Sequence, residues 1–241
     1  MDRGDGRQQG TDVSDFAGFP AATFEFLTGI AAHNDKEWFE AHRPLYEAGY
    51  VEPAKAFVAA LGPQLKKTSP TVQFEPKVNG SLQRVNRDIR FSKDKRPYKT
   101  HLNAWFWHGD RKGWDCPGFW FQLTPDRVWM GVGMHGLQGE VLDAYRQSVI
   151  HPRSAKALLK AFETVEAKGY EMGEKTRKLM PKGFPTDGPA AEYLLYESLH
   201  AMKELPAEAA KAPDFADVCA RHYKAMWPIG QWLLTEVSAG A

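Results

Sequence analysis

The first third of the chain has apolar residues at helical spacing. After Pro20, a residue favoured in the first turn of a helix, this spacing predicts a helix over residues 20–32. Asn34, with a glutamate three residues later, forms a variant of the capping box and predicts the start of a second helix that reaches Leu65. Pro44 and Pro53, inside this span, predict either a kink or two shorter helices.

Beyond residue 70 apolar residues alternate with polar ones, which is the spacing of strands that bury one face. The expected strands cover residues 72–78, 82–88, 101–108, 118–124 and 127–134. Thr124, Pro125 and Asp126 predict a short hairpin turn between the last two strands.

Helical spacing returns after Gly139. Helices are expected around residues 141–149, 152–165, 189–197 and 213–235, and a short strand is expected at 198–204. Helices first, an antiparallel sheet in the middle and helices last predict a single α+β domain over residues 16–236. In this fold a central, mostly antiparallel sheet is flanked by the N- and C-terminal helices.

The composition is that of an ordinary folded domain, because hydrophobic residues make up 43% and charged residues 25% of the 241 residues. Lys and Arg total 31 and Asp and Glu total 30, so the net charge is +1. This balance argues against a surface that binds nucleic acid or an anionic membrane as a whole. Residues 1–15 carry too few apolar side chains for a secretory signal and predict a disordered tail. No apolar stretch is long enough to span a bilayer, so no membrane association is expected.

Two cysteines, Cys116 and Cys219, are too few for a disulfide framework or a four-ligand zinc site. A reduced, cytoplasmic protein without a metal site is the simplest interpretation. The chain has neither a Gly-rich phosphate loop nor a dinucleotide-binding motif, so the sequence leaves the cofactor and the oligomeric state unknown.

Positive charge gathers in one segment of the chain. Residues 84–99 contain seven Lys or Arg and two Asp, a net charge of +5, which leaves the rest of the chain at −4. The run RDxRFSxDKxPYKT at residues 87–100 resembles a motif of the DUF2461 family of uncharacterised proteins. The resemblance extends to residues 34–39 and 131–134 and covers nearly the whole chain from Phe16. It implies no activity, because the family has no established one, so function is argued from the residues themselves.

Three interpretations of residues 84–99 are open. In the first, guanidinium and ammonium groups bind an anion such as a phosphate or a carboxylate. In the second, Arg87 and Asp88, together with the charged residues 93–95, form an internal ion-pair network that orders a loop. In the third, the segment is a solvated loop. The candidate ligand-binding residues of this segment are Arg84, Arg87, Arg90, Ser92, Lys93, Asp94, Lys95, Tyr98 and Lys99.

Five of the eight tryptophans lie between Trp105 and Trp129. Strand alternation assigns the aliphatic and phenylalanine side chains of three strands to one face, which is the expected core. The opposite face carries two amides, a histidine, two glycines and the tryptophans Trp105, Trp107, Trp120 and Trp129. Either helices cover this face, or it is a stacking wall for a planar or sugar-like ligand beside the basic segment. Glycines within strands often mark the close approach of a ligand or of another backbone.

Asp88 and His101 are the candidate acid–base residues. The arginines beside Asp88 favour an ion pair for that carboxylate, whereas His101 has the ordinary histidine range for proton transfer near pH 7. The leading hypothesis is a protein that binds a phosphorylated or otherwise anionic small molecule, with group transfer or hydrolysis as the reaction if it is an enzyme. The alternative is a non-catalytic interaction module that contacts nucleic acid or an acidic protein surface.

Overall fold

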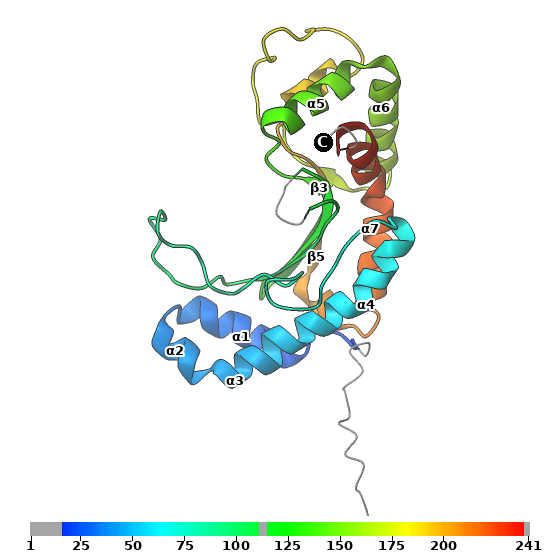
Figure 1. Ribbon diagram of the computed structural model, residues 1–241. Coiled ribbons are helices and arrows are strands. Elements are labelled where there is room, and N and C mark those ends of the chain that lie inside the picture. The colour runs from blue at the N-terminus through cyan, green and yellow to red at the C-terminus, as the bar shows by residue number, and fades with distance from the viewer. Residues whose placement is uncertain (1–15, 111–114, 239–241) are drawn as a thin grey trace, which may run out of the picture.

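The structure, a computed structural model, describes residues 16–110 and 115–238. Its architecture is α+β, with helices around a five-stranded antiparallel sheet, so the predicted fold class is confirmed (Figure 1). The predicted disordered tail at residues 1–15 lies outside the described residues. Over the described part of the chain, no helix combines the length and the apolar character needed to cross a membrane.

The N-terminal part of the chain is helical, as predicted, but is divided into more pieces. It comprises α1 (Ala21–Ala32), α2 (Lys36–Ala41), α3 (Arg43–Tyr46), a π-helical turn (Glu47–Val51) and α4 (Glu52–Thr68). Pro44 lies in the first turn of α3, where the missing amide hydrogen has no helical partner to lose. Pro53 follows the π-helical turn, and Val51 and Glu52 before it keep helical backbone angles. Pro44 therefore begins a helix, whereas the chain stays helical across Pro53.

The cap of α2 differs from the predicted one. Asp35, and not Asn34, caps the helix, because its Oδ1 accepts a hydrogen bond from the Trp38 amide at 2.8 Å. Trp38 then lies against α1, where a Cβ on Gly29 would be 2.3 Å from Cζ2 of the indole. The absence of a side chain at Gly29 in α1 thus leaves room for the Trp38 ring of α2.

The sheet has the strand order β1 (Leu102–Phe106), β2 (Gly118–Leu123), β3 (Arg127–Met134), β5 (Leu199–Pro206) and β4 (Glu171–Met172). Every neighbouring pair is antiparallel. β1 to β3 form a meander, and β5 returns from far along the chain to place Leu199 opposite Met134. The strands expected at residues 101–108, 118–124, 127–134 and 198–204 are confirmed, and β4 is an additional one.

Residues 72–78 and 82–88 form no strands, so these two predictions are wrong. They make isolated bridges only, such as those between Gln73 and Trp107 and between Leu82 and Ala104. A turn interrupts the segment at Asn79, whose φ is 59°. Single apolar side chains anchor it in the core, so the alternation arises without a continuous ladder.

The C-terminal part adds α5 (Gly139–Ile150), α6 (Pro152–Glu166) and α7 (Phe215–Trp232), and a π-helical turn (Leu233–Val237) follows α7. The helix expected at residues 189–197 is instead a short 3-10 helix (Ala191–Leu195), so that prediction is wrong in type. The sequence before it is rich in Pro and Gly, which leaves too few residues for an α-helix.

The core lies between the sheet and the helices α4 and α7 (Figure 1). The strand side chains buried there are those that alternation assigns to the core: Leu102, Ala104, Phe106, Phe119, Phe121, Leu123, Val128, Met130, Val132 and Met134. Tyr223 and Trp227 of α7 pack on Phe119, with ring centroids 5.4 and 4.9 Å apart. These helices therefore occupy the face of the sheet that lies away from Trp105 and Trp120.

Candidate ligand-binding site

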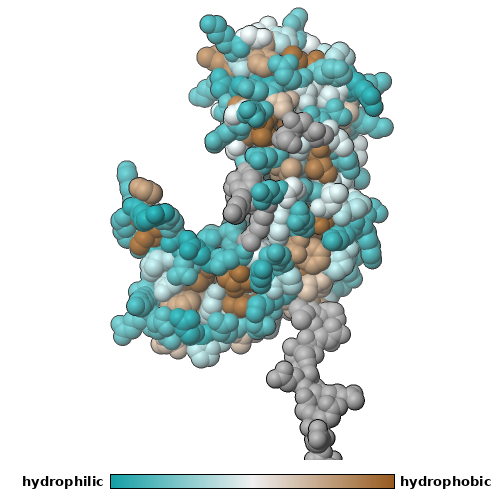
Figure 2. All heavy atoms as spheres, in the orientation of Figure 1, coloured by the Kyte–Doolittle hydropathy of each residue, from teal (hydrophilic) through white to brown (hydrophobic). Residues whose placement is uncertain are grey.

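The tryptophan face of the sheet holds a small pocket. Its volume is about 180 Å³, and its lining includes Gln83, Asn103, Trp105, Trp120, Gln122 and His135. The helices α4 and α7 lie on the other side of the curved sheet (Figure 1), and in the same orientation the molecule is hollowed beside the sheet (Figure 2). Both indoles at the pocket are partly exposed. The α-helices that pack on the sheet thus leave this part of the tryptophan face open.

Glycines in neighbouring strands leave room for the aromatic rings of this face. A Cβ on Gly118 would lie 2.4 Å from Trp105, and one on Gly131 would lie 2.6 Å from Trp120. Gly173 stands in the same relation to the ring of His200, at 2.6 Å. Any larger residue at these positions would displace a ring, so the glycines are explained by the protein's own aromatic side chains.

Two buried polar atoms at the pocket have no partner among the described residues. They are the Nε1 donor of Trp120 and the Oδ1 acceptor of Asn103. The Nδ2 of Asn103 donates to Oε1 of Gln83 at 3.4 Å. Buried polar groups are normally satisfied, so an unpaired donor and an unpaired acceptor in one pocket are typical of a site that a polar ligand completes.

A cationic end adjoins the pocket at Lys99. Its Nζ donates to the same Oε1 of Gln83 at 2.8 Å. Burial, and then the nearby charge of Arg84, lower the pKa of this ammonium group. Within the described chain neither Arg84 nor Lys99 forms an ion pair with a carboxylate. Positive charge that is partly desolvated and unneutralised is well suited to hold an anion.

In residues 87–98, here called the arm, both aspartates pair with arginines and a net charge of +3 remains. Arg87 and Arg96 both bind Asp94, with N–O distances of 2.9 and 2.8 Å, and Arg90 binds Asp88 at 2.7 Å. Arg87 also donates to the carbonyl of Arg96 and contacts the Ser92 hydroxyl. Because Asp88 pairs with Arg90, the expected pair between Arg87 and Asp88 is wrong in its partner. The internal network is nevertheless present, with its centre at Asp94.

The remaining arm residues divide between anchors and exposed groups. Tyr98 is buried, and its ring stacks on Phe39 with centroids 4.4 Å apart. Lys95 donates to the carbonyl of Ile89 at 3.0 Å, whereas Lys93 is exposed. Of the predicted ligand-binding cations in the segment, Lys99 contacts a lining residue of the pocket, whereas Arg84 is exposed and its charge contributes to the lowered pKa of Asp88.

The two candidate acid–base residues are not joined by any described contact. Asp88 is exposed, and its hydrogen bonds from Arg90 lower the pKa of the carboxyl group. His101 directly precedes β1, and its carbonyl accepts from Tyr50 at 3.4 Å. Burial, followed by the charges of Lys99 and Arg87, lowers the pKa of its imidazole. His101 thus belongs to the cationic end of the pocket, and Asp88 belongs to the arm.

Two of the four tryptophans predicted to form the stacking wall line the pocket, namely Trp105 and Trp120. Trp107 is buried, and its main chain is bridged to Gln73. Trp129 donates to Oε2 of Glu204 at 2.7 Å and carries the guanidinium of Arg127 over its ring. Neither of these tryptophans lines the pocket.

A histidine pair at the far end of the pocket is not evident from the sequence. The rings of His135 and His200 lie 4.3 Å apart, and Ser198 Oγ is 3.4 Å from Nδ1 of each. Burial, and then the proximity of His135, lower the pKa of His200 to about 4. The pair results from the pairing of β5 with β3, which sets His200 opposite Gly133. Across the described ranges no three His, Cys, Asp or Glu side chains gather as a metal site.

The family comparison agrees with this arrangement of motifs. The family model described as "Conserved hypothetical protein (DUF2461)" matches residues 22–232. The chain belongs to the DUF2461 family. The match includes the arm, the pocket and all of α7, so the site lies within the part that defines the family. No curated protein and no solved structure gave a match.

Proposed function

We propose that this DUF2461 protein binds a phosphorylated or otherwise anionic small molecule in the pocket that lies between Lys99 and Trp120. The observation that carries the proposal is the shared partner Gln83, which joins the unneutralised ammonium of Lys99 to the pocket amide of Asn103. The anion would bind at Lys99 and Arg84, at the base of the arm. The arm's outer arginines are supporting residues, because their charges already face Asp88 and Asp94.

The body of the ligand would lie against the indoles of Trp105 and Trp120. The free N–H of Trp120 and the free carbonyl oxygen of Asn103 favour a ligand with hydroxyl groups or other mixed donors and acceptors. The pocket volume of about 180 Å³ is below the ~300–1,000 Å³ of sites for drug-sized ligands. A ligand of the size of a sugar phosphate therefore fits the proposal better than a dinucleotide.

If the protein is an enzyme, the proposed reaction is group transfer or hydrolysis on this ligand. His101 is the better candidate base of the two predicted residues, because its lowered pKa keeps the imidazole neutral at pH 7. Asp88 is held by Arg90 in an exposed ion pair and is a weak base for that reason.

One observation favours the alternative function as an interaction module. Phe91 is 93% exposed on the arm, with the guanidinium of Arg90 5.7 Å from its ring centroid. An exposed ring among cations suits contacts with single-stranded nucleic acid or with an acidic protein surface.

The free thiols of Cys116 and Cys219 support the further proposal of a reducing, cytoplasmic location.

Isothermal titration with inorganic phosphate, glucose 6-phosphate, AMP and a single-stranded 12-mer DNA tests the proposal. The variant Lys99→Met retains the length of the side chain but removes its charge, and Lys93→Met removes an exposed charge of the same arm as a control. A charge-assisted hydrogen bond contributes about 1.5–3 kcal/mol, so Lys99→Met should weaken binding of a phosphate ligand about tenfold or more. The control should change affinity less than about twofold.

Two results would contradict the binding proposal. Absence of binding by every phosphorylated small molecule at millimolar concentration would remove it altogether. Binding of the 12-mer alone, with an affinity that falls steeply as salt increases, would favour the interaction module instead.

A further inference from the structure

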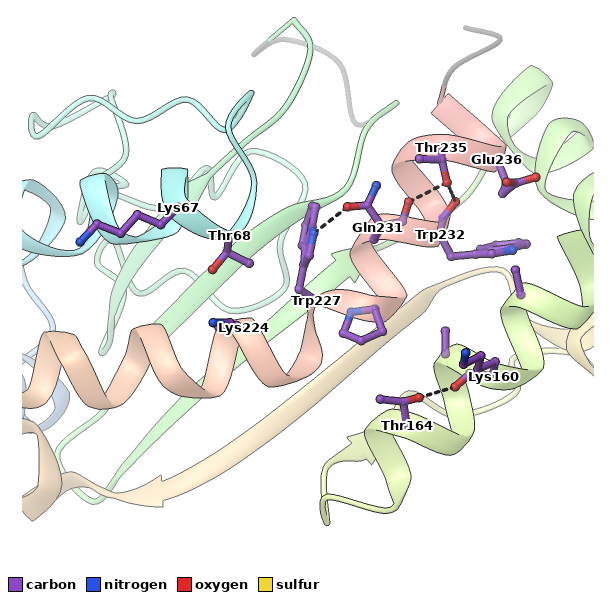
Figure 3. A pocket seen from close by; sticks show the side chains of 13 residues that line it. Lys67, Thr68, Lys160, Thr164, Lys224, Trp227, Gln231, Trp232, Thr235 and Glu236 are labelled. Atoms are coloured by element: carbon purple, nitrogen blue, oxygen red, sulfur yellow. Dashed lines mark hydrogen bonds between the residues drawn. The ribbon is translucent and has the colours of Figure 1, made fainter.

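A second pocket lies among the helices and shares no lining residue with the tryptophan-face pocket (Figure 3). Its volume is about 580 Å³, which is within the range of sites for drug-sized ligands. It is formed where α4 ends beside α6 and the C-terminal half of α7. Its lining residues are Lys67, Thr68, Ala157, Lys160, Ala161, Thr164, Lys224, Trp227, Pro228, Gln231, Trp232, Thr235 and Glu236.

The floor of this second pocket is apolar and preformed. Trp227 donates from Nε1 to Gln231, and Trp232 donates to the carbonyl of Ser154, each at 3.0 Å. These bonds satisfy both indole N–H groups and fix both rings. Figure 3 shows the bond between Trp227 and Gln231. Ala157 and Ala161 of α6 lie opposite α7 and have short side chains. A bound apolar group would meet surfaces that need no rearrangement.

Pro228 contributes to the polarity of the wall. Because proline has no amide hydrogen, the carbonyl of Lys224 one turn earlier loses its helical hydrogen bond. Both residues line the pocket.

The charged groups of the second pocket are unbalanced. Lys67, Lys160 and Lys224 come from three different helices, and Glu236 is the one acidic residue in the described lining. None of the three lysines forms an ion pair with any carboxylate that the structure describes. A positive rim above an apolar floor is complementary to a molecule with an apolar body and an anionic head group.

We propose that the pocket between α6 and α7 binds an amphiphilic organic anion, an acyl or aryl compound with one acidic head group. The apolar body lies along Trp227, Trp232 and Ala161, and the head group meets the lysines at the rim. This site is independent of the function proposed for the tryptophan face.

The fluorescent probe 1-anilinonaphthalene-8-sulfonate has this chemistry and allows a direct titration, with decanoate as a competitor. Ala157→Trp fills the pocket from the exposed side of α6 and leaves every charge in place. The double variant Lys160→Gln/Lys224→Gln removes two rim charges, and Lys168→Gln is a control outside the pocket. We expect one probe molecule per chain and displacement by decanoate. We expect affinity at least about tenfold lower in Ala157→Trp and in the double variant, and no change in the control.

The uncharged analogue N-phenyl-1-naphthylamine separates the apolar part of the proposal from the ionic part. It should bind to the wild type more weakly than the sulfonate does. Its affinity should be the same for the wild type and for the double lysine variant. Sulfonate binding that is unchanged in Ala157→Trp would overturn the assignment to this pocket. Sulfonate binding that is unchanged in the double lysine variant would overturn the role of the rim, and this second test holds even if Ala157→Trp fails to fold.

Discussion

The side chain of Asn34 forms hydrogen bonds with both the backbone N–H and the backbone carbonyl of Tyr98, a pair of bonds here called the bracket. Its Oδ1 accepts from the Tyr98 amide at 2.9 Å, and its Nδ2 donates to the Tyr98 carbonyl at 3.0 Å. Nδ2 also donates to the carbonyl of Ile30 at 3.1 Å, which ties the bracket to the end of α1. The two motifs that carry the family resemblance, around residues 34 and 98, are thus one structural unit. The arm is anchored at its C-terminal end by a residue from the first helix pair.

Replacement of Asn34 by Ala should therefore destabilise the protein and loosen the arm. Loss of the bracket leaves a partly buried amide and carbonyl of Tyr98 without partners, which costs about 2–3 kcal/mol in the free energy of unfolding. Urea denaturation measures this loss, and hydrogen exchange at the Tyr98 amide reports the local opening. Asp35→Ala is the control, because it removes only a helix cap worth about 1 kcal/mol. Equal effects of the two variants on exchange at Tyr98 would argue against the bracket.

Arg87 should control the order of the arm more than the stability of the whole protein. It contacts Asp94, the Arg96 carbonyl and Ser92, but its ion pair is partly solvated, so Arg87→Ala should cost only about 1 kcal/mol. Chymotrypsin should cut at the exposed Phe91 several times faster in this variant, because cleavage requires an extended, mobile segment. Arg90→Ala serves as the comparison, since the side chain of Arg90 pairs with Asp88, two residues before it, and also contacts the Phe91 ring. Similar cleavage rates in both variants would be inconsistent with a central role for Arg87.

Gly29 and Trp38 should show strong coupling in a double-mutant cycle. Gly29→Ala places a methyl group against the Trp38 ring and should destabilise the wild type by about 1–3 kcal/mol. In a Trp38→Ala background the obstruction is gone, and the higher helix propensity of alanine should make the same change stabilising by up to about 1 kcal/mol. Thermal or chemical denaturation of the four proteins gives the coupling energy. A change of the same sign in both backgrounds would refute the packing explanation of Gly29.

The free energy of unfolding should fall as the pH drops from about 6.5 to about 4. The pKa of His200 is about 4 in the folded protein, so over this range the unfolded chain takes up a proton that the folded site resists. His135, whose pKa is also lowered, acts in the same direction. His200→Gln should therefore lose less stability than the wild type between pH 7 and pH 4, as measured by urea denaturation. Parallel pH curves for the two proteins would show that His200 does not contribute to this loss.

The sequence predicts the sheet well because a buried face imposes period two on each strand. Phe119, Phe121 and Leu123 are buried, whereas Trp120 and Gln122 are partly exposed, as alternation requires. Residues 70–100 are different because their order depends on distant partners. Alternation there reflects single anchors such as Leu82 and Val85, and no local pattern reveals that Asn34 is the partner of Tyr98.

The candidate site could be predicted from the sequence only in part, because some of its contacts also depend on distant partners. Lys99, Trp105 and Trp120 are conspicuous by residue type and by neighbouring position in the sequence. Gln83 and His200 become visible only through tertiary contacts, since one bonds to Lys99 and the other is set opposite Gly133 by the pairing of β5 with β3. Ion-pair partners likewise depend on the turn of the arm, which brings Asp94 and not Asp88 to Arg87.

The central position of β3 has a consequence for the order of folding. The connections that join β1, β2 and β3 are 11 and 3 residues long, shorter than the connection from β3 to β5, so this meander can form early. β5 can pair with β3 only after the long connection through α5 and α6 has been brought back to the sheet. Until then β3 exposes an unpaired edge, and the histidine pair at Gly133 does not exist. The candidate pocket is therefore assembled in stages: the pairing of β1 with β2 sets Trp105 opposite Trp120, and the histidine end forms only when β5 pairs with β3.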